Sequence, residues 1–295
     1  MKAKYLSLGM LFSLLLAACG GTGQVETLIP VSEKALGDTS SVFYADFASY
    51  PVERAHLPIG VFDSGTGGLT VQEKLLTLDE FDNITGKQSP DGIPDFAGEN
   101  FVYLADDANM PYGDYDAAGK SDYLRELVVK DALFLLGDSY YNLALDEKPY
   151  GKKEQVKILV IACNTATAYG LGDIEKLLGR SGTGVKVIGV INAGVRATLA
   201  DMDPAKNYAV GVMATPGTIS SGAYARTFKE MAAEQGFQGE IQVVSQPALG
   251  FANAVDGIED YVKPGIVLPR DEYRGPKLGN QEGDINPSIM DRYNF

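Results

Sequence analysis

Cys163 is the residue of this chain whose position most favours chemistry. It follows the apolar run at 158–162 and precedes Asn164, Thr165 and a helical pattern that continues to Leu178. Open α/β sheets present reactive groups at the carboxyl ends of their strands, and a helix N-terminus there stabilises a thiolate. A lone cysteine is more often a small buried apolar residue, but this context predicts a reactive thiol with a usable thiolate fraction at neutral pH.

Three other polar segments also follow expected strands. They are DSGTGG with Asp63 and Ser64, PYG with Pro111, Tyr112 and Gly113, and ATPGT with Thr215 and Thr218. The glycines of the first segment allow close backbone approach, and the amides of the helix after it can hold a carboxylate, with phosphate as a weaker alternative. Each segment alone could be an ordinary turn, but their shared position at strand ends predicts one crevice.

The elements that position these segments alternate along the chain. Strands are expected at 59–62, 101–105, 157–161, 185–191, 208–213 and 241–244, and helices at 69–78, 121–145, 166–178, 193–201, 218–235 and 249–258. Apolar strands followed by amphipathic helices indicate parallel sheets with covered faces, so the predicted class is α/β. The stretches 79–100 and 146–155 are predicted insertions, and 89–95 is expected to be a solvated turn because it lacks EF-hand spacing.

Composition excludes some classes of function. The chain has 295 residues with 45% hydrophobic content, so it can bury a sizeable core. Its 25 basic and 39 acidic residues give a net charge of −14 without a basic cluster, so no nucleic-acid partner is expected. His56, the single histidine, precedes the first strand and is predicted to be solvated.

The N-terminal sequence predicts an export signal. Lys2 and Lys4 precede a largely apolar run at 6–16, and Cys19 follows two alanines. The segment resembles the bacterial lipoprotein signal, which implies lipid on Cys19 and a bacterial envelope location on the periplasmic face of a membrane, the outer membrane if there is one. The alternative is ordinary cleavage with Cys19 incidental. Lipidation would leave Cys163 without a disulfide partner.

Taken together, the four strand-end segments resemble those of the cofactor-independent aspartate/glutamate racemases, and glutamate racemase most closely. The resemblance covers about 57–258. It implies two pseudo-symmetric parallel-sheet domains with a small acidic amino acid, L/D-glutamate or aspartate, held in the cleft between them. No cofactor or metal is implied, and a homodimer is left open as a further partner.

The resemblance also implies roles for individual residues. In the family, one cysteine thiolate removes the α-proton and a second cysteine reprotonates the opposite face. Cys163 corresponds to the first base, with Asp63 and Ser64 holding or polarising the amino-acid head group. The remaining substrate contacts would come from Asn164 and Thr165 beside the thiol, and from Pro111, Tyr112, Gly113, Thr215 and Thr218.

One departure from the family pattern limits the expected function. The family's second cysteine lies in a GCTH motif after ATPGT, and this sequence has no such cysteine. We expect either a truncated copy or a diverged one that lost a base, and therefore a lipid-anchored racemase-like enzyme of impaired competence. The alternative is a non-catalytic envelope lipoprotein that binds acidic amino acids; a thiol hydrolase ranks third.

These features predict five regions. They are a signal peptide at 1–18, a tether at 19–56, a first domain at 57–185, a partial second domain at 186–262 and a polar tail at 263–295.

Overall fold

The computed structural model of the protein describes residues 27–142, 149–255, 257 and 261. The predicted signal peptide, the predicted lipidation site Cys19 and the predicted tail at 263–295 lie outside the described residues. Within the described ranges, none of the helices combines the length and hydropathy that a membrane crossing needs.

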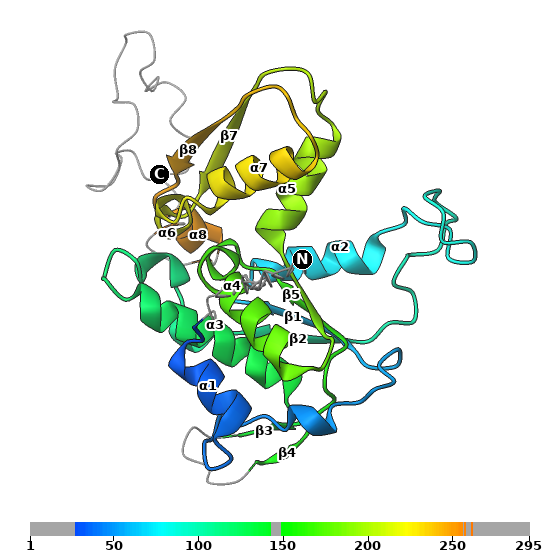
Figure 1. Cartoon of the computed structure of the whole chain (residues 1–295), viewed down its shortest axis with the longest axis vertical. Coiled ribbons are helices and arrows are strands. Elements are labelled where there is room, and N and C mark those ends of the chain that lie inside the picture. Colours follow the sequence, from blue (N-terminus) through cyan, green and yellow to red (C-terminus); the bar gives the residue numbers. More distant parts are fainter. Residues whose placement is uncertain (1–26, 143–148, 256, 258–260, 262–295) are drawn as a thin grey trace, which may run out of the picture.

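A four-stranded parallel sheet forms the centre of the larger part of the molecule (Figure 1). Its strands, in the order β2-β1-β5-β6, are β1 (Ile59–Asp63), β2 (Phe101–Ala105), β5 (Ile158–Ile161) and β6 (Lys186–Gly189). Asp63 pairs with Ala105, and Phe62 pairs with Ile161. This register brings the ends of β1, β2 and β5, and the polar segments after them, to one edge of the sheet.

Helices cover both faces of this sheet, as the apolar strands predicted. Successive side chains of a strand point to opposite faces. Val61 packs in a cluster with Val71 and Leu75 of α2 (Gly68–Thr77), whereas Phe62 lies in the larger core cluster. That cluster includes buried leucines of α3 (Ser121–Leu136) and α4 (Asn164–Ser181). The α/β class is therefore confirmed, and the sheet is fixed by packing on both sides.

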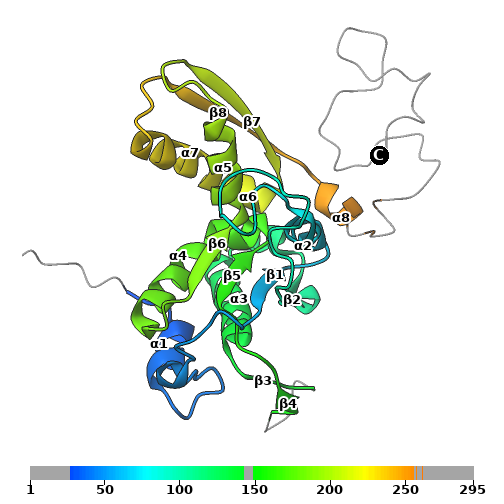
Figure 2. The same cartoon turned by 90° about the vertical axis from the view of Figure 1, so that its right-hand side faces the viewer.

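A smaller unit lies at one end of the first sheet (Figure 2). It contains α5 (Val190–Ala200), β7 (Tyr208–Ala214), α6 (Pro216–Ser220), α7 (Ala223–Glu234), β8 (Ile241–Pro247) and α8 (Phe251–Val255). β7 and β8 form a two-stranded parallel sheet. Ile191, Val195 and Leu199 of α5 pack with Phe228 of α7 in a separate core. Among the described residues, the second unit is partial.

Several predicted boundaries are corrected by the tertiary structure. β6 pairs with β5, so the first unit extends through Gly189 instead of ending at 185. The helix expected at 218–235 is divided into α6 and α7 because Gly222 has a left-handed φ of 65°. α3 ends at Leu136, before Gly137, and does not continue to 145; residues 143–148 lie outside the described part.

The described part of the predicted tether at 19–56 is folded, which corrects that prediction. Helix α1 (Pro30–Gly37) buries Val31 and Ala35 in the main core, beside α3 and α4. A short 3-10 helix, η1 (Phe47–Ser49), follows, and the Tyr50 hydroxyl donates to the Val156 carbonyl over 2.6 Å. The sequence did not predict this packing, because the composition of 19–56 is mostly polar and these apolar residues are few. His56 is exposed, as predicted.

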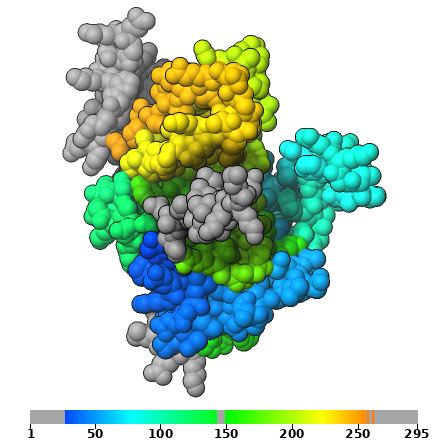
Figure 3. All heavy atoms as spheres, viewed as in Figure 1, coloured from blue at the N-terminus to red at the C-terminus, as the bar shows by residue number. Residues whose placement is uncertain are grey.

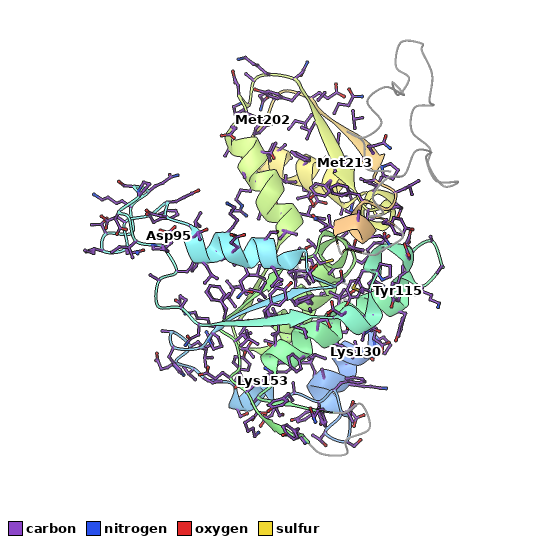
Figure 4. All side chains as sticks on the ribbon, turned by 180° about the vertical axis from the view of Figure 1, so that it is seen from behind. Asp95, Tyr115, Lys130, Lys153, Met202 and Met213 are labelled. Atoms are coloured by element: carbon purple, nitrogen blue, oxygen red, sulfur yellow. The ribbon has the colours of Figure 1, made fainter. Side chains whose placement is uncertain are left out.

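The predicted insertion at 79–100 projects from the body beyond α2 (Figure 3), and Asp95 lies in it (Figure 4). Its carboxylates bind backbone amides: Asp79 accepts from Asp91 and Gly92, and Asp95 accepts from Glu80 and Phe81. These contacts and the exposure of the segment agree with a solvated turn. The described part of the second insertion contains β4 (Gly151–Lys152), which pairs antiparallel with β3 (Ser139–Tyr140).

Candidate active site

Cys163 lies between β5 and α4, at the strand-end position that the sequence predicted. It is the N-cap residue of α4, and its Sγ accepts a hydrogen bond from the Ala166 amide over 3.4 Å. The Ser64 Oγ lies 3.5 Å from the same sulfur. Cys163 is only 7% exposed and belongs to the edge of the main core cluster. The thiol therefore has polar neighbours from the turn after β1 and from the start of α4, but little contact with solvent.

The pKa of the Cys163 thiol is raised to about 11. Burial is the main cause, and the nearby negative charge of Asp63 adds to it. Hydrogen bonds from the Ala166 amide and Ser64 lower the pKa, but by less. The expectation of a usable thiolate fraction at neutral pH is therefore wrong for this conformation, because desolvation outweighs the helix N-terminus.

Asp63 is fixed by the glycine-rich turn that follows it. It is 6% exposed, and its Oδ2 accepts a hydrogen bond from the Gly68 amide over 2.7 Å, at the start of α2. A Cβ on Gly68 would lie 2.6 Å from the Asp63 Cβ and 2.8 Å from the Tyr103 hydroxyl. That hydroxyl donates to the Gly65 carbonyl over 3.2 Å. Glycine at 68 is thus a packing requirement that orients the Asp63 carboxylate.

Three threonines join the two units beside Cys163. The Thr165 Oγ1 lies 3.1 Å from the Thr215 Oγ1 and 2.9 Å from the Thr218 Oγ1. Thr215 also donates to Thr218 over 3.0 Å, and caps α6 by accepting from the Thr218 amide. Thr165 and Thr218 are buried. The structure therefore brings these three predicted residues together as one hydroxyl cluster, which we call the threonine cluster.

Two more contacts bridge the units near the same place. The Tyr224 hydroxyl of α7 donates to the Asn164 Oδ1 over 2.7 Å. Gly113 lies against α6, since a Cβ on Gly217 would be 2.6 Å from the Gly113 carbonyl oxygen. The expected crevice is thus spanned by direct contacts. Tyr224 was not predicted, because its place in a helix 60 residues from Asn164 gives no local signal.

The PYG segment presents its backbone, not the Tyr112 side chain, toward the site. Tyr112 begins η3 (Tyr112–Asp114) and is 2% exposed. Its hydroxyl lies 2.5 Å from the Asp106 Oδ2 and 2.8 Å from the Asp131 Oδ2. The Tyr112 side chain is thus held between Asp106 and Asp131, whereas Gly113 packs against Thr215 of the threonine cluster. Asp131 has no local sequence signal, since it lies within an apolar helix.

A cavity of about 390 Å³ lies between α4, α5 and α7. Its lining includes Arg125, Asp173, Asn192 and Arg226, and it contains none of the predicted site residues. Within the described ranges, no group of three or more His, Cys, Asp or Glu side chains could hold a metal ion.

The fold and the site define an α/β protein that carries a cysteine and convergent hydroxyl groups at the strand ends of a parallel sheet. The chain is 34% identical over 177 residues to a glutamate racemase from Syntrophus aciditrophicus, a match that covers 60% of this chain and 49% of the relative. It is 35% identical over 173 residues to a glutamate racemase from Oceanobacillus iheyensis, covering 59% and 47%. No protein-family model matches the chain.

A crystal structure of a glutamate racemase isoform from Bacillus anthracis aligns with 70% of this chain and 58% of that one, with a TM-score of 0.46 and 25% identity. The similarity in sequence to the curated relatives supports the racemase family, in agreement with the resemblance of the four strand-end segments. The chain spans about half the length of these curated relatives.

Proposed function

We propose that the protein is a cofactor-independent, glutamate-racemase-like isomerase that removes the α-proton of L/D-glutamate or aspartate. The observation that carries the proposal is the position of the Cys163 Sγ, 3.5 Å from the Ser64 Oγ and beside the charge of Asp63 at the strand ends. The similarity to curated glutamate racemases supports the same reaction class.

Substrate binding would activate the thiol. With a pKa of about 11, the thiol is protonated at neutral pH. The ammonium group of an amino acid placed near Asp63 would neutralise the charge that disfavours the thiolate, and would itself favour the thiolate. We therefore propose that the base forms in the bound complex and not before it.

The chemical step is a proton transfer between carbon and sulfur. The Cys163 thiolate takes the α-proton and becomes a thiol, while the electron pair of the C–H bond stays on the α-carbon and spreads into the substrate carboxylate. In this proposal, the threonine cluster and the first amides of α4 would donate to that carboxylate as its charge grows. Return of a proton from the same thiol restores the starting isomer.

Inversion needs an acid on the opposite face of the α-carbon. The chain has two cysteines, and only Cys163 lies at a strand end of the described structure. One thiol exchanges the α-hydrogen with solvent on a single face. We therefore propose an enzyme of impaired competence, in which α-hydrogen exchange with retention of configuration is faster than racemisation.

The test is to incubate the whole chain with D- and L-glutamate and D- and L-aspartate in deuterated water. Proton NMR measures α-hydrogen loss, and chiral chromatography measures inversion. Exchange that disappears in Cys163→Ala and persists in Cys19→Ala, the matched cysteine control, supports the proposal. Exchange that survives in Cys163→Ala overturns it. A thermal shift with an acidic amino acid but no exchange in any variant would instead identify a binding lipoprotein.

We also propose that lipid on Cys19 anchors the protein in the bacterial envelope, on the periplasmic face of a membrane. The basic residues Lys2 and Lys4, the apolar run after them and the small residues before Cys19 support this proposal. Membrane fractionation with mass spectrometry of the N-terminal peptide tests it, and Cys19→Ala should release the protein. A homodimer is a further proposal, tested by light scattering of purified protein.

A further inference from the structure

We infer that Asp131 is a positioning residue that acts as a neutral acid, holding the loop at 106–113 in place through a hydrogen-bond chain from Asp131 to Tyr112 to Asp106. The expected pH dependence of folding stability does not depend on the proposed function. The expected change in the KM for α-hydrogen exchange rests on that function.

This hydrogen-bond chain runs from α3, through the buried Tyr112 side chain, to the half-buried Asp106 after β2. Asp131 is 7% exposed and Tyr112 is 2% exposed. The Tyr112 hydroxyl lies 2.8 Å from one Asp131 oxygen and 2.5 Å from one Asp106 oxygen, and Asp106 is half-buried. Both distances are those of strong hydrogen bonds between oxygen atoms. In the described part of the protein, the titratable groups that act on the pKa of Asp131 are Asp106 after β2 and Tyr112 of η3.

The number of protons shared by Asp131, Tyr112 and Asp106 indicates that Asp131 is neutral. A phenol carries one proton, so the Tyr112 hydroxyl can donate to only one of its two carboxyl neighbours. If both carboxyls were ionised, the other contact would place two acceptors together without a proton. A protonated Asp131 removes this conflict, because it donates to the Tyr112 oxygen while Tyr112 donates to Asp106. Burial, and then the charge of Asp106, raise the pKa of Asp131 to about 8, which agrees with this arrangement.

Asp106 connects the chain to the candidate site. Its side chain accepts two contacts from the Asn109 Nδ2, at 2.8 and 3.0 Å, which shape the loop after β2. Its backbone amide donates to the Asp63 carbonyl over 2.9 Å. The far end of the loop, at Gly113, packs against Thr215 and Gly217. Loss of the Asp131 proton would therefore disturb the backbone that lies next to both Asp63 and the threonine cluster.

The sign of the pH effect follows from the raised pKa. An aspartate that titrates near 3.9 when unfolded and near 8 when folded takes up one proton on folding between those values. Stability is therefore highest below the unfolded pKa and falls as pH rises toward the folded pKa. Relative to a variant with a neutral group at 131, the folding equilibrium constant should fall by up to about tenfold per pH unit between about pH 5 and 7.

The experiment compares the wild-type protein, at its full length of 295 residues, with the Asp131→Asn variant. The side-chain amide of that variant can donate to Tyr112 at every pH. Urea unfolding from pH 4 to 9 measures the ratio of folding constants. Asp122→Asn, an exposed position on the same helix, controls for loss of an acid. The expected result is that Asp131→Asn gains stability relative to wild type as pH rises, whereas Asp122→Asn shows no such trend.

A second measurement separates positioning from stability alone. Above pH 8, the KM for α-hydrogen exchange should rise in wild type and stay lower in Asp131→Asn. A stability ratio that does not change with pH overturns the inference, as does an equal rise of KM in the two proteins. If no variant exchanges hydrogen but the stability ratio follows pH as expected, the proposed function fails while the charge state of Asp131 stands.

Discussion

The Cys163 Sγ and the Ser64 Oγ lie 3.5 Å apart although 99 residues separate them in the chain. They meet because β1 and β5 are paired in parallel register and both residues follow the strand ends. Such a contact fixes the thiol relative to the glycine-rich turn. It also places a polar side chain of the first strand-end segment beside the sulfur.

Alkylation of Cys163 should show a high apparent pKa. The rate with iodoacetamide should be slow at pH 7 and increase as pH approaches about 11, because only the thiolate reacts. Asp63→Asn should shift the profile to lower pH by removing a negative charge, and Ser64→Ala should shift it to higher pH. Peptide mapping by mass spectrometry follows residue 163. Identical profiles in all three proteins would contradict the assigned causes.

Gly68→Ala should destabilise the protein by about 1 to 3 kcal/mol, as overpacking of a tight site does. The new Cβ would lie 2.6 Å from the Asp63 Cβ and 2.9 Å from the Ala162 Cβ. Gly172→Ala is the matched control, since its Cβ would meet nothing within 4 Å. That change lies in α4 and should be neutral or stabilise the protein by up to about 1 kcal/mol. Urea unfolding measures both variants.

Thr165 and Thr218 should be energetically coupled across the two units. Their hydroxyls are 2.9 Å apart and both side chains are buried. A double-mutant cycle with Thr165→Val and Thr218→Val should give a coupling of about 0.5 to 1.5 kcal/mol, typical of one net hydrogen bond. Thr198→Val, at a half-buried position of α5, is the control, because the coupling of this distant residue to Thr165 should be near zero. Additive effects of the first pair would indicate that the units separate in solution.

Val31→Asp should destabilise the main unit by more than about 2 kcal/mol, because it places a charge in the core next to α3 and α4. Val31 is 3% exposed, whereas Val42, in the same N-terminal region, is 79% exposed. Val42→Asp is therefore the control and should change stability by less than about 0.5 kcal/mol. Thermal unfolding distinguishes the two. Equal effects would mean that α1 does not stay docked in solution.

The sequence by itself determined the order of strands and helices in the first unit and the position of Cys163, Asp63 and the threonines at strand ends. These features follow from local patterns: apolar runs form buried strands, and glycine, proline or threonine ends them. The same patterns predicted the α/β class, and the four strand-end segments carried the resemblance to racemases. They also predicted that 79–100 would be an insertion, since that stretch has few apolar residues.

Only the tertiary structure decided the state of the thiol, the orientation of Tyr112, the sheet to which β6 belongs and the docking of α1. Each of these depends on groups that are distant in sequence. Burial by the main core raises the pKa of Cys163, and Asp131 of α3 holds the Tyr112 hydroxyl inward. β6 belongs to the first sheet because it forms hydrogen bonds with β5. α1 packs against the main core through a few apolar residues, although the surrounding sequence is polar. Desolvation and long-range pairing are properties of the assembled core, so no local pattern encodes them.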